Sequence, residues 1–238
     1  MSKIIDEIPM EQIISRQVKL WERTYEKGTI DSEKVSKLCL TISKEMGSQG
    51  VEFAQGLSKR LKWKLYDKEL VDYIAEHANV RKNMVESFDE KTQNEIHNWV
   101  LTLVNHHALG SDKYFKHLVT VITAIGESGC SIILGRGANF ILPAHKTLRL
   151  RIVASLARRI ENLMHLKAVS KKQALEMLCQ ADKARTAFIQ RFFHHESEEP
   201  SNYDLVLNLA SLGFEVAEEI VIHTLHVKFP GVEISESE

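Results

Sequence analysis

Cysteine, proline and net charge are all scarce in this sequence, and each shortage excludes a class of protein. The three cysteines in 238 residues include no Cys-x-x-Cys pair, so we expect a reduced, cytoplasmic protein rather than a disulfide-stabilised one. Four prolines leave no long proline-rich linker. The formal net charge of −1 offers no basic surplus to neutralise phosphates, which argues against a nucleic-acid partner.

Long apolar runs, a secretion signal and repeats are missing as well. No apolar run approaches the roughly 18 residues that a membrane span needs, so we expect no membrane partner. The opening stretch "MSKIIDEIPMEQ" is acidic and has no signal-peptide pattern. With 44% hydrophobic and 26% charged residues, the composition is typical of an ordinary globular protein.

Five short apolar runs are present, and longer helical patterns lie between them. Strands that alternate with helices pair in parallel, because each crossover helix returns the chain to the same end of the sheet. The pattern therefore predicts an α/β fold with a five-stranded parallel sheet flanked by helices. The predicted strands are Leu38–Ser43, Lys64–Tyr66, Ser131–Gly135, Thr147–Val153 and Asp204–Leu209.

Residues 1–37 precede the first predicted strand and form a helical extension in this interpretation. Their apolar positions recur every three or four residues, as on one face of an amphipathic helix: Met10, Ile14, Val18, Trp21 and Tyr25. The helix either packs on its own domain, which we favour, or docks on a second subunit in a homodimer. We expect residues 38–228 to be the domain and residues 229–238 a flexible tail.

The turn after the first predicted strand has the position of a phosphate-binding loop but not its usual residues. A strand, a glycine-containing turn and a helix N-terminus present backbone N–H groups to phosphate oxygens. The pattern G-x-x-x-x-G-K-[ST] puts Lys44 at the first glycine, Gly50 at the lysine and Glu52 near the hydroxyl residue. Alone, the glycine pair in "GSQG" is a weak signal, because such pairs are more often simple turns.

Four stretches in one order resemble the cytidylate kinase-like family, a divergent branch of the P-loop nucleoside monophosphate kinases. They are "ISKEMGSQGVEFAQGLSKRLKWKLYDKELVDYIA", "IILGRGANFIL", "LRLRIVASLARRIENLM" and "DKARTAFIQRFFHHESEEPSNYDLVLNLASLGFEVAEEIV". The resemblance covers about residues 38–226. It implies a P-loop NTPase-type sheet with a helical lid, ATP as phosphoryl donor with Mg²⁺, and a nucleoside monophosphate, typically CMP or dCMP, as acceptor.

By this resemblance, the loop holds the phosphates of ATP. From its position at the start of the loop, Lys44 is the candidate that replaces the missing lysine as a catalytic residue. A lysine stem is long enough to reach from the start of the loop to a bound triphosphate; the alternative is a weak surface pair between Lys44 and Glu45. Mg²⁺ is expected to arrive with ATP near Ser48, without dedicated protein ligands. The residues assigned to the phosphates are Gly47, Ser48, Gln49, Gly50, Val51 and Glu52.

Phosphoryl transfer depends on positioning and positive charge, so the arginines are the other residues to follow. Arg136, in "GRG", follows a strand and matches the arginine that contacts the acceptor phosphate. Arg159 and Arg185 match catalytic arginines of the family, whereas the role of Arg191 stays open. A solvated helix face is an equally good interpretation of Arg159. Asp182, assigned to the acceptor side, can instead pair with Arg185 three residues later.

Tyr66 and Asp67 complete the acceptor side, because family members carry a similar pair at the end of the second strand. Asp67 also has the position of an N-cap for the next helix. Residues 81–110 occupy the region where monophosphate kinases insert acceptor-binding helices. Two functions are therefore compatible with the sequence: an ATP-dependent CMP or dCMP kinase, which we favour, and a catalytically weak or inactive nucleotide-binding regulator on the same scaffold.

The regulator remains an alternative because catalytic residues of cytidylate kinases are missing. Gly50 stands where the phosphate-binding lysine is expected. Cytidylate kinases proper also carry an aspartate on each side of the Gly-Arg pair, where this chain has Leu134 and Gly137.

Overall fold

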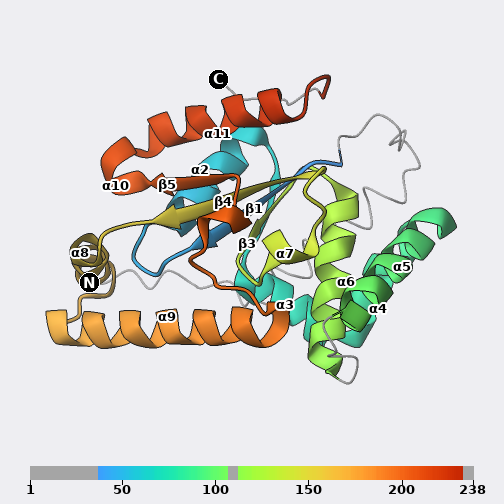
Figure 1. The fold of residues 1–238 in the computed structure, drawn as a ribbon, viewed down its shortest axis with the longest axis horizontal. Helices are drawn as coiled ribbons and strands as arrows, with labels where there is room; N and C mark the ends of the chain where they lie inside the picture. Colours follow the sequence, from blue (N-terminus) through green and yellow to red (C-terminus); the bar gives the residue numbers. More distant parts are fainter. Residues whose placement is uncertain (1–36, 107–111, 233–238) are drawn as a thin grey trace, which may run out of the picture.

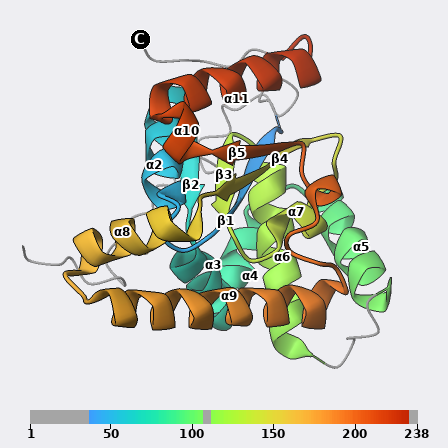
Figure 2. The ribbon, with the colours of Figure 1, turned by 60° about the vertical axis from the view of Figure 1, so that its left-hand side comes forward.

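The chain forms a five-stranded parallel sheet in the order β2-β3-β1-β4-β5, with helices on both faces (Figures 1 and 2). The computed structural model describes residues 37–106 and 112–232. The strands are β1 (Cys39–Lys44), β2 (Lys64–Tyr66), β3 (Ser131–Leu134), β4 (Thr147–Val153) and β5 (Leu205–Asn208). The predicted fold class is confirmed, and all five predicted strands are present with ends that differ by no more than one residue. The amphipathic pattern predicted before residue 37 lies outside the described residues.

The central strand β1 creates the crevice in which a ligand would bind. It pairs with β3 on one side and with β4 on the other. The strand order therefore changes direction at β1: β2 and β3 lie on one side of it, and β4 and β5 lie on the other. In open α/β sheets, ligands bind outside the carboxyl ends of the strands at such a switch point. Ile42 of β1 lies opposite Leu134, the last residue of β3, so β1 extends two residues farther than β3 at this edge and both following loops start near it.

Two hydrophobic cores cover the two faces of the sheet, as the alternation of side chains in a strand requires. On one face, Ile132 and Leu134 pack with α2 (Gly50–Leu61) and α11 (Phe214–Lys228). On the other face, Ile133 packs with Ile189, Phe192 and Phe193 of a later helix and with the five helices between β2 and β4. Those helices are α3 (Lys68–Glu76), α4 (Ala78–Glu86), α5 (Glu90–His106), α6 (Lys113–Ser128) and α7 (Ala138–Ile141).

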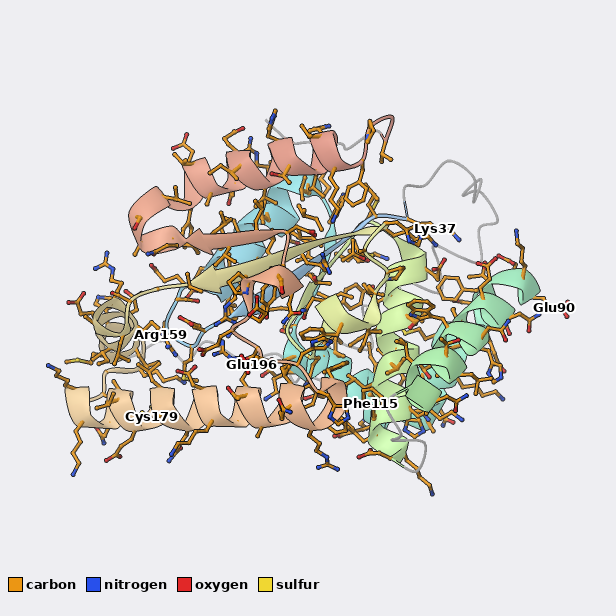
Figure 3. All side chains as sticks on the ribbon, in the orientation of Figure 1. Lys37, Glu90, Phe115, Arg159, Cys179 and Glu196 are labelled. Atoms are coloured by element: carbon orange, nitrogen blue, oxygen red, sulfur yellow. The ribbon has the colours of Figure 1, made fainter. Side chains whose placement is uncertain are left out.

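A helical hairpin borders the carboxyl edge of the sheet, where the lid was predicted. It consists of α8 (Leu156–Lys167) and the 23-residue α9 (Lys171–Phe193). The start of α9 is fixed by a capping box, in which Ser170 and Gln173 satisfy each other's backbone N–H groups. Figure 3 shows Arg159 above the part of α9 that contains Cys179, and Phe115 beside the other end of the helix. The hairpin therefore spans the site from the β4 side to α6.

Two short elements complete the order, η1 (Pro200–Asn202) and α10 (Leu209–Leu212). Across the described residues, no helix combines the length and the apolar character that crossing a bilayer requires.

Candidate functional site

The loop between β1 and α2, residues 45–49, is a tight turn that packs against α8. Gly47 and Gln49 both have left-handed backbones, with φ of 78° and 62°. A Cβ on Gly47 would lie 2.6 Å from the backbone oxygen of Arg159, so only glycine permits this approach. From α8, Arg159 Nε donates to the Met46 oxygen at 2.7 Å and Asn162 Nδ2 donates to the Gly47 oxygen at 2.8 Å. The loop is thus held from the α8 side through its carbonyl groups.

The side chain of Lys44 runs alongside Gly50, the residue at the position of the usual phosphate-binding lysine. A Cβ built on Gly50 would lie 2.8 Å from the Cβ and 3.3 Å from the Cδ of Lys44. A side chain at residue 50 and the stem of Lys44 therefore compete for the same space. Burial lowers the pKa of Lys44 below its ordinary value of 10.5, and the carboxylates of Glu69 and Glu52 act in the opposite direction.

The predicted alternative for Lys44, a surface pair with Glu45, is wrong, because Glu45 is engaged elsewhere. Its Oε1 accepts a hydrogen bond from Arg151 Nη2 at 3.1 Å, and its Oε2 accepts one from the Ala154 N–H at 3.3 Å. The same Oε2 lies 3.7 Å from Arg159 Nη1. Lys44 is therefore not held by the acid next to it in the sequence.

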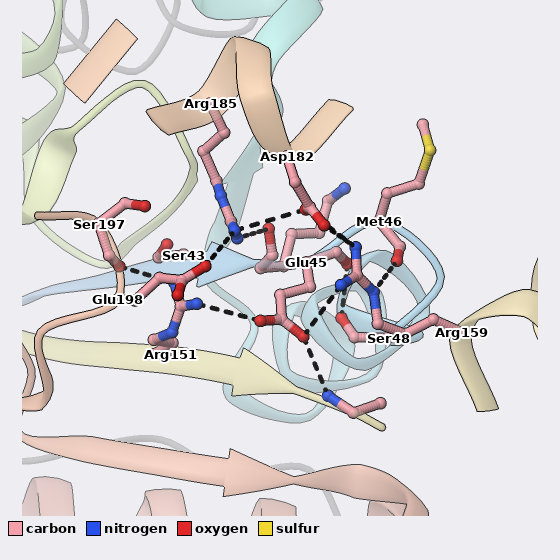
Figure 4. Close-up of polar contacts among 12 residues, drawn as sticks. Ser43, Glu45, Met46, Ser48, Arg151, Arg159, Asp182, Arg185, Ser197 and Glu198 are labelled. Carbon is pink, nitrogen blue, oxygen red and sulfur yellow. Dashed lines mark hydrogen bonds and ion pairs between the residues drawn. The ribbon is translucent and has the colours of Figure 1, made fainter. Parts of the chain in front are cut away.

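These contacts belong to a continuous chain of alternating charges, which we call the ion-pair chain (Figure 4). Arg159 Nη2 lies 2.8 Å from Asp182, Asp182 lies 3.4 Å from Arg185, and Arg185 lies 3.6 Å from Glu198. The chain connects β4, the β1–α2 loop, α8, α9 and the segment before η1. In order, its members are Arg151, Glu45, Arg159, Asp182, Arg185 and Glu198.

The ion-pair chain changes the interpretation of two predicted residues. Arg159 is only 6% exposed, so the alternative of a solvated helix face is wrong; its guanidinium joins the loop to the lid helix. The predicted pairing of Asp182 with Arg185 is present, at 3.4 Å. Arg185 also donates from Nη1 to the Lys44 oxygen at 3.3 Å, which places it directly over the end of β1.

A cavity of about 480 Å³ lies between the end of β1, the end of β3, the start of α3 and α9. We call it the central cavity. Its wall includes six of the predicted site residues, Lys44, Val51, Asp67, Arg136, Asp182 and Arg185. These residues are far apart in the sequence, and the switch-point topology brings them to one edge of the sheet.

A smaller cavity of about 260 Å³, the loop cavity, lies between the β1–α2 loop and α8. Lys44 lines this cavity as well as the central one, so its side chain stands between the two spaces. The α8 side contributes Asn162, His165 and Lys167. The residues assigned to the phosphates that line it are Gly47, Gln49, Gly50, Val51 and Glu52.

Arg136 is held in a fixed orientation at the central cavity. It has a left-handed backbone (φ 54°) between two glycines that also have positive φ. A positive φ is uncommon for residues other than glycine, and such residues are often found at functional sites. Its guanidinium forms an ion pair with Asp72 of α3 and lies 5.1 Å from the centre of the Phe188 ring. Tyr114 also donates to Asp72, at 3.0 Å. These contacts leave the guanidinium little freedom to move.

Tyr66, Arg191 and Ser48 line neither the central nor the loop cavity, whereas Asp67 lines the central cavity and also has a structural role. Tyr66 is 6% exposed and packs in a hydrophobic core, and the central cavity lining does not include it, so the structure does not bring it to the acceptor side. Asp67 is the N-cap of α3, accepting from the Leu70 N–H at 2.9 Å. Arg191 points elsewhere and pairs with Asp112 at 2.9 Å. Ser48 is buried and donates to the Glu45 oxygen at 2.7 Å.

Asp72, Arg151 and Asn139 line or support the site although the sequence analysis did not select them. Asp72 lies 64 residues before its partner Arg136, and Arg151 lies 106 residues after Glu45. Nothing in the local sequence marks such pairs. Asn139 had a signal, since it follows "GRG" by two residues, a segment that the strand-end argument had already placed at the ligand edge.

Gly137 cannot carry the aspartate that cytidylate kinases have at this position. A Cβ there would lie 2.2 Å from the Phe193 ring, and the backbone has a φ of 67°. The aromatic ring occupies the space that a side chain at residue 137 would need.

No group of three His, Cys, Asp or Glu side chains suited to a metal ion occurs in residues 37–106 and 112–232. This is compatible with Mg²⁺ that enters with a nucleotide, because Mg²⁺ keeps several waters and uses one or two carboxylates plus phosphate oxygens. Glu52, beside Lys44 at the start of α2, is a carboxylate of the loop cavity.

The sheet order, the loop after β1 and the arginine-lined edge are features of P-loop kinases. The model of the cytidylate kinase-like family matches residues 39–211, more than half of the sequence, and the chain belongs to this family. It therefore has a nucleotide-kinase type of scaffold.

Among solved structures, an uncharacterized protein from Eubacterium ventriosum is similar, with 22% identity and a TM-score of 0.64 over 80% of this chain and 99% of that one. This similarity concerns the fold alone. Shikimate kinase from Bacteroides thetaiotaomicron gives 12% identity and a TM-score of 0.44 over 79% of this chain and 98% of that one.

Among curated proteins, the uronate isomerase of Corynebacterium glutamicum is 28% identical over 111 residues. This alignment includes 46% of the present chain but only 21% of the isomerase. The chain thus spans about a fifth of the length of this relative.

Proposed function

We propose that the protein transfers the γ-phosphoryl group of ATP to a nucleoside monophosphate, with CMP or dCMP as the preferred acceptor. The observation that carries the proposal is the convergence of Lys44, Arg136 and Arg185 on the central cavity. They come from the end of β1, the turn after β3 and the lid helix α9. Phosphoryl transfer requires positive charge on several sides of one phosphoryl group, and these three side chains provide it. Family membership supports the kinase class.

In this proposal the β1–α2 loop and the N-terminus of α2 bind the triphosphate through backbone N–H groups. Lys44 provides the mobile positive charge that Gly50 lacks, because its stem already passes Gly50. Arg136 binds the acceptor phosphate, and Arg185 reaches the transferred group from above. Arg185 would exchange part of its contact with Asp182 for the substrate when the hairpin closes and excludes water.

Mg²⁺ bound with ATP would neutralise charge on the β- and γ-phosphates. Glu52 and the hydroxyl oxygen of Ser48 are the loop groups nearest in sequence to the expected position of the ion. An ion held partly by phosphate oxygens needs few protein ligands, so the donor set of the loop is compatible with it. Such a phosphotransferase would work where ATP is available, which agrees with the expected cytoplasmic location.

A coupled turnover assay tests the proposal directly. The full chain is incubated with ATP and Mg²⁺ and, in turn, with CMP, dCMP, UMP and AMP, while calorimetry measures binding of each nucleotide. We expect turnover, fastest with CMP or dCMP. Turnover with none of the acceptors, together with measurable binding of ATP or CMP, would reject the kinase and support a regulator.

The regulator is kept as a second candidate because of the ion-pair chain. Arg159 and Arg185 are both paired with carboxylates in the described structure, so neither side chain is available without a rearrangement. With Gly50, Leu134 and Gly137 at three positions that carry charged residues in cytidylate kinases, binding without transfer is the outcome that these residues favour.

The homodimer through residues 1–37 also stays a proposal. Lys37 forms an ion pair with Glu127 at 3.0 Å, so a truncation should remove residues 1–36 and keep Lys37. Sedimentation of the truncated chain separates the two interpretations. A dimer that becomes a monomer supports docking on a second subunit, and an insoluble product supports packing on the same domain.

A further inference from the structure

The wall of the central cavity carries carboxylates as well as the basic groups that we assign to phosphate. They are Asp67, Glu69 and Asp182. Two of them are engaged within the protein, because Asp67 accepts from the Leu70 N–H at 2.9 Å and Asp182 belongs to the ion-pair chain. Glu69 differs: its carboxylate forms no hydrogen bond or ion pair with another group of residues 37–106 and 112–232. It is therefore the carboxylate of this wall that is available to a ligand.

The backbone that carries Glu69 is fixed at the edge of the cavity. Glu69 is the second residue of α3, which starts where β2 ends, and Asp67 caps that start. The next two residues, Leu70 and Val71, are 7% and 0% exposed and pack in the core. Glu69 itself is exposed and lines the cavity. A ligand in the cavity can therefore contact its side chain without a movement of α3.

The Glu69 carboxylate lies near the side chain of Lys44. Glu69 raises the pKa of the Lys44 ammonium more than Glu52 does, the other carboxylate that acts on it. The Glu69 charge is thus close enough to Lys44, another residue of the cavity wall, for the two charges to interact. This places an acceptor-only group beside the part of the cavity that we assign to phosphate.

A carboxylate and a phosphate do not bind each other. An ionised carboxylate accepts hydrogen bonds and donates none, so it repels phosphate oxygens. It forms strong, charge-assisted hydrogen bonds with hydroxyl and amino groups. Because Lys44, Arg136 and Arg185 attract the phosphate of a ligand, Glu69 contributes to binding only through another part of the same ligand.

We propose that Glu69 is a substrate-contacting residue that accepts a hydrogen bond from a hydroxyl or amino group of the acceptor. The acceptor class is accordingly a phosphomonoester that carries such donors beyond its phosphate. Arg136 binds the phosphate and Glu69 binds the other part, so the two residues together orient the acceptor. This inference rests on the proposed function insofar as the acceptor is taken to occupy the central cavity.

Two simpler roles of Glu69 lead to different expectations. A carboxylate in the first turn of a helix interacts favourably with the helix dipole; loss of that role alone lowers stability and changes no affinity. A carboxylate near Lys44 also offsets part of its positive charge. If that were its only role, its removal would strengthen the binding of inorganic phosphate and CMP alike.

The test measures binding of CMP and of inorganic phosphate to the full chain by calorimetry, without Mg²⁺, so that a metal ion contributes nothing. Glu69→Ala should reduce CMP affinity about tenfold or more, as expected for the loss of a hydrogen bond to a charged group. The affinity for inorganic phosphate should not fall. Glu69→Gln keeps an acceptor oxygen without the charge, so its loss of CMP affinity should be smaller.

The matched control is Glu90→Ala. Glu90 is an exposed acid in the first turn of α5 and lines neither the central nor the loop cavity, so this variant should change no affinity. Ribose 5-phosphate then identifies the donor of the acceptor. A loss that Glu69→Ala causes for both CMP and ribose 5-phosphate indicates a sugar hydroxyl, and a loss for CMP alone indicates the amino group of the base.

Several outcomes would overturn the inference. These are unchanged or increased CMP affinity of the Glu69→Ala variant, equal losses for CMP and inorganic phosphate, or no binding of CMP and ribose 5-phosphate to the unaltered protein. Failure of the proposed function looks different. If CMP binds in a Glu69-dependent way but receives no phosphoryl group, the kinase proposal fails and the role of Glu69 stands.

Discussion

The ion-pair chain and the wall of the central cavity use the same residue type in opposite ways. Along the ion-pair chain, every arginine faces a carboxylate, as Arg159 does between Glu45 and Asp182. On the cavity wall, Arg136 keeps a buried Nε without an acceptor although its other end is anchored to Asp72. Arg185 belongs to both regions, with its Nη atoms in the ion-pair chain and its Nε unsatisfied.

The difference shows that residue type alone does not reveal the surroundings of an arginine in this protein. Arg159 is buried among protein groups that bind its guanidinium. Arg136 lines the central cavity. Arg159 and Arg136 match family arginines equally well in sequence, and only their surroundings distinguish them.

The largest effect should come from breaking the ion-pair chain at Arg159. Arg159 is buried and lies between two carboxylates, although Arg151 is buried slightly more. Replacing Arg159 with leucine leaves Asp182 and Glu45 without one of their partners, and breaking a buried pair costs about 3–5 kcal/mol. We expect a value near the lower end, because Glu45 keeps Arg151. Urea unfolding measures it.

The matched control is Arg158→Leu, one residue earlier on the same helix. Its ion pair with Glu161 is an exposed one, with side-chain exposures of 51% and 65%, and such pairs contribute about 0–1 kcal/mol. Equal destabilisation by the two variants would mean that the ion-pair chain contributes nothing special to stability.

On the cavity side, Arg136→Ala should act on binding more than on folding. A hydrogen bond between charged groups contributes about 1.5–3 kcal/mol, so CMP affinity should fall about tenfold or more. Calorimetry with CMP measures the loss, and thermal unfolding confirms that the variant is folded. Arg149→Ala, whose ion pair with Asp204 lies away from the central cavity lining, should leave CMP affinity unchanged. If the Arg136 variant is folded and binds CMP with full affinity, Arg136 does not belong to the CMP-binding site.

Gly50→Ala tests whether residue 50 and Lys44 share one space. The added methyl group meets the Lys44 Cβ at 2.8 Å, and overpacking of this kind costs about 1–3 kcal/mol. The same change made in a Lys44→Gly background should be much milder, since the conflicting atoms are gone. A double-mutant cycle by urea unfolding measures the coupling. Additive effects of the two changes would show that the side chains do not compete.

The smallest expected effect concerns pH. Burial lowers the pKa of Lys44 in the free protein; the surrounding charged groups are Glu69, Glu52, Arg185 and Lys68. If the ammonium binds ATP, ATP affinity should fall as the pH rises through this pKa, and therefore below the ordinary value of 10.5. Folding stability should change in the opposite direction over the same window, because the unfolded chain then binds the extra proton.

Lys44→Ala should remove this pH dependence and weaken ATP binding, whereas Lys59→Ala, at an exposed position of α2, should do neither. ATP titrations of the two variants from neutral pH to pH 10.5 provide the measurement. Identical titration curves for both variants would mean that the loop binds ATP through its backbone alone.

Much of the architecture was predictable because its signals are local. Strand positions follow from short apolar runs, the N-cap of α3 from Asp67, and the ligand edge from the "GRG" turn after β3. The loop pattern placed Lys44 at the start of the loop and so led to the prediction that it replaces the missing lysine. These features depend on neighbours within a few residues, where periodicity and capping operate.

The partners of the site residues depended on tertiary structure. The sequence alone determined a five-stranded parallel sheet with a glycine-containing loop after its first strand and an arginine after its third strand, at the same edge of the sheet. Only the fold decided that Arg159 contacts α9 and that Tyr66 faces the core. It also decided that Phe193 fills the space beside Gly137 and that Asn139 lines the central cavity. Contacts between residues 64 or 106 positions apart leave no periodic signal, because sheet order and helix packing set them rather than the residues beside them in the chain.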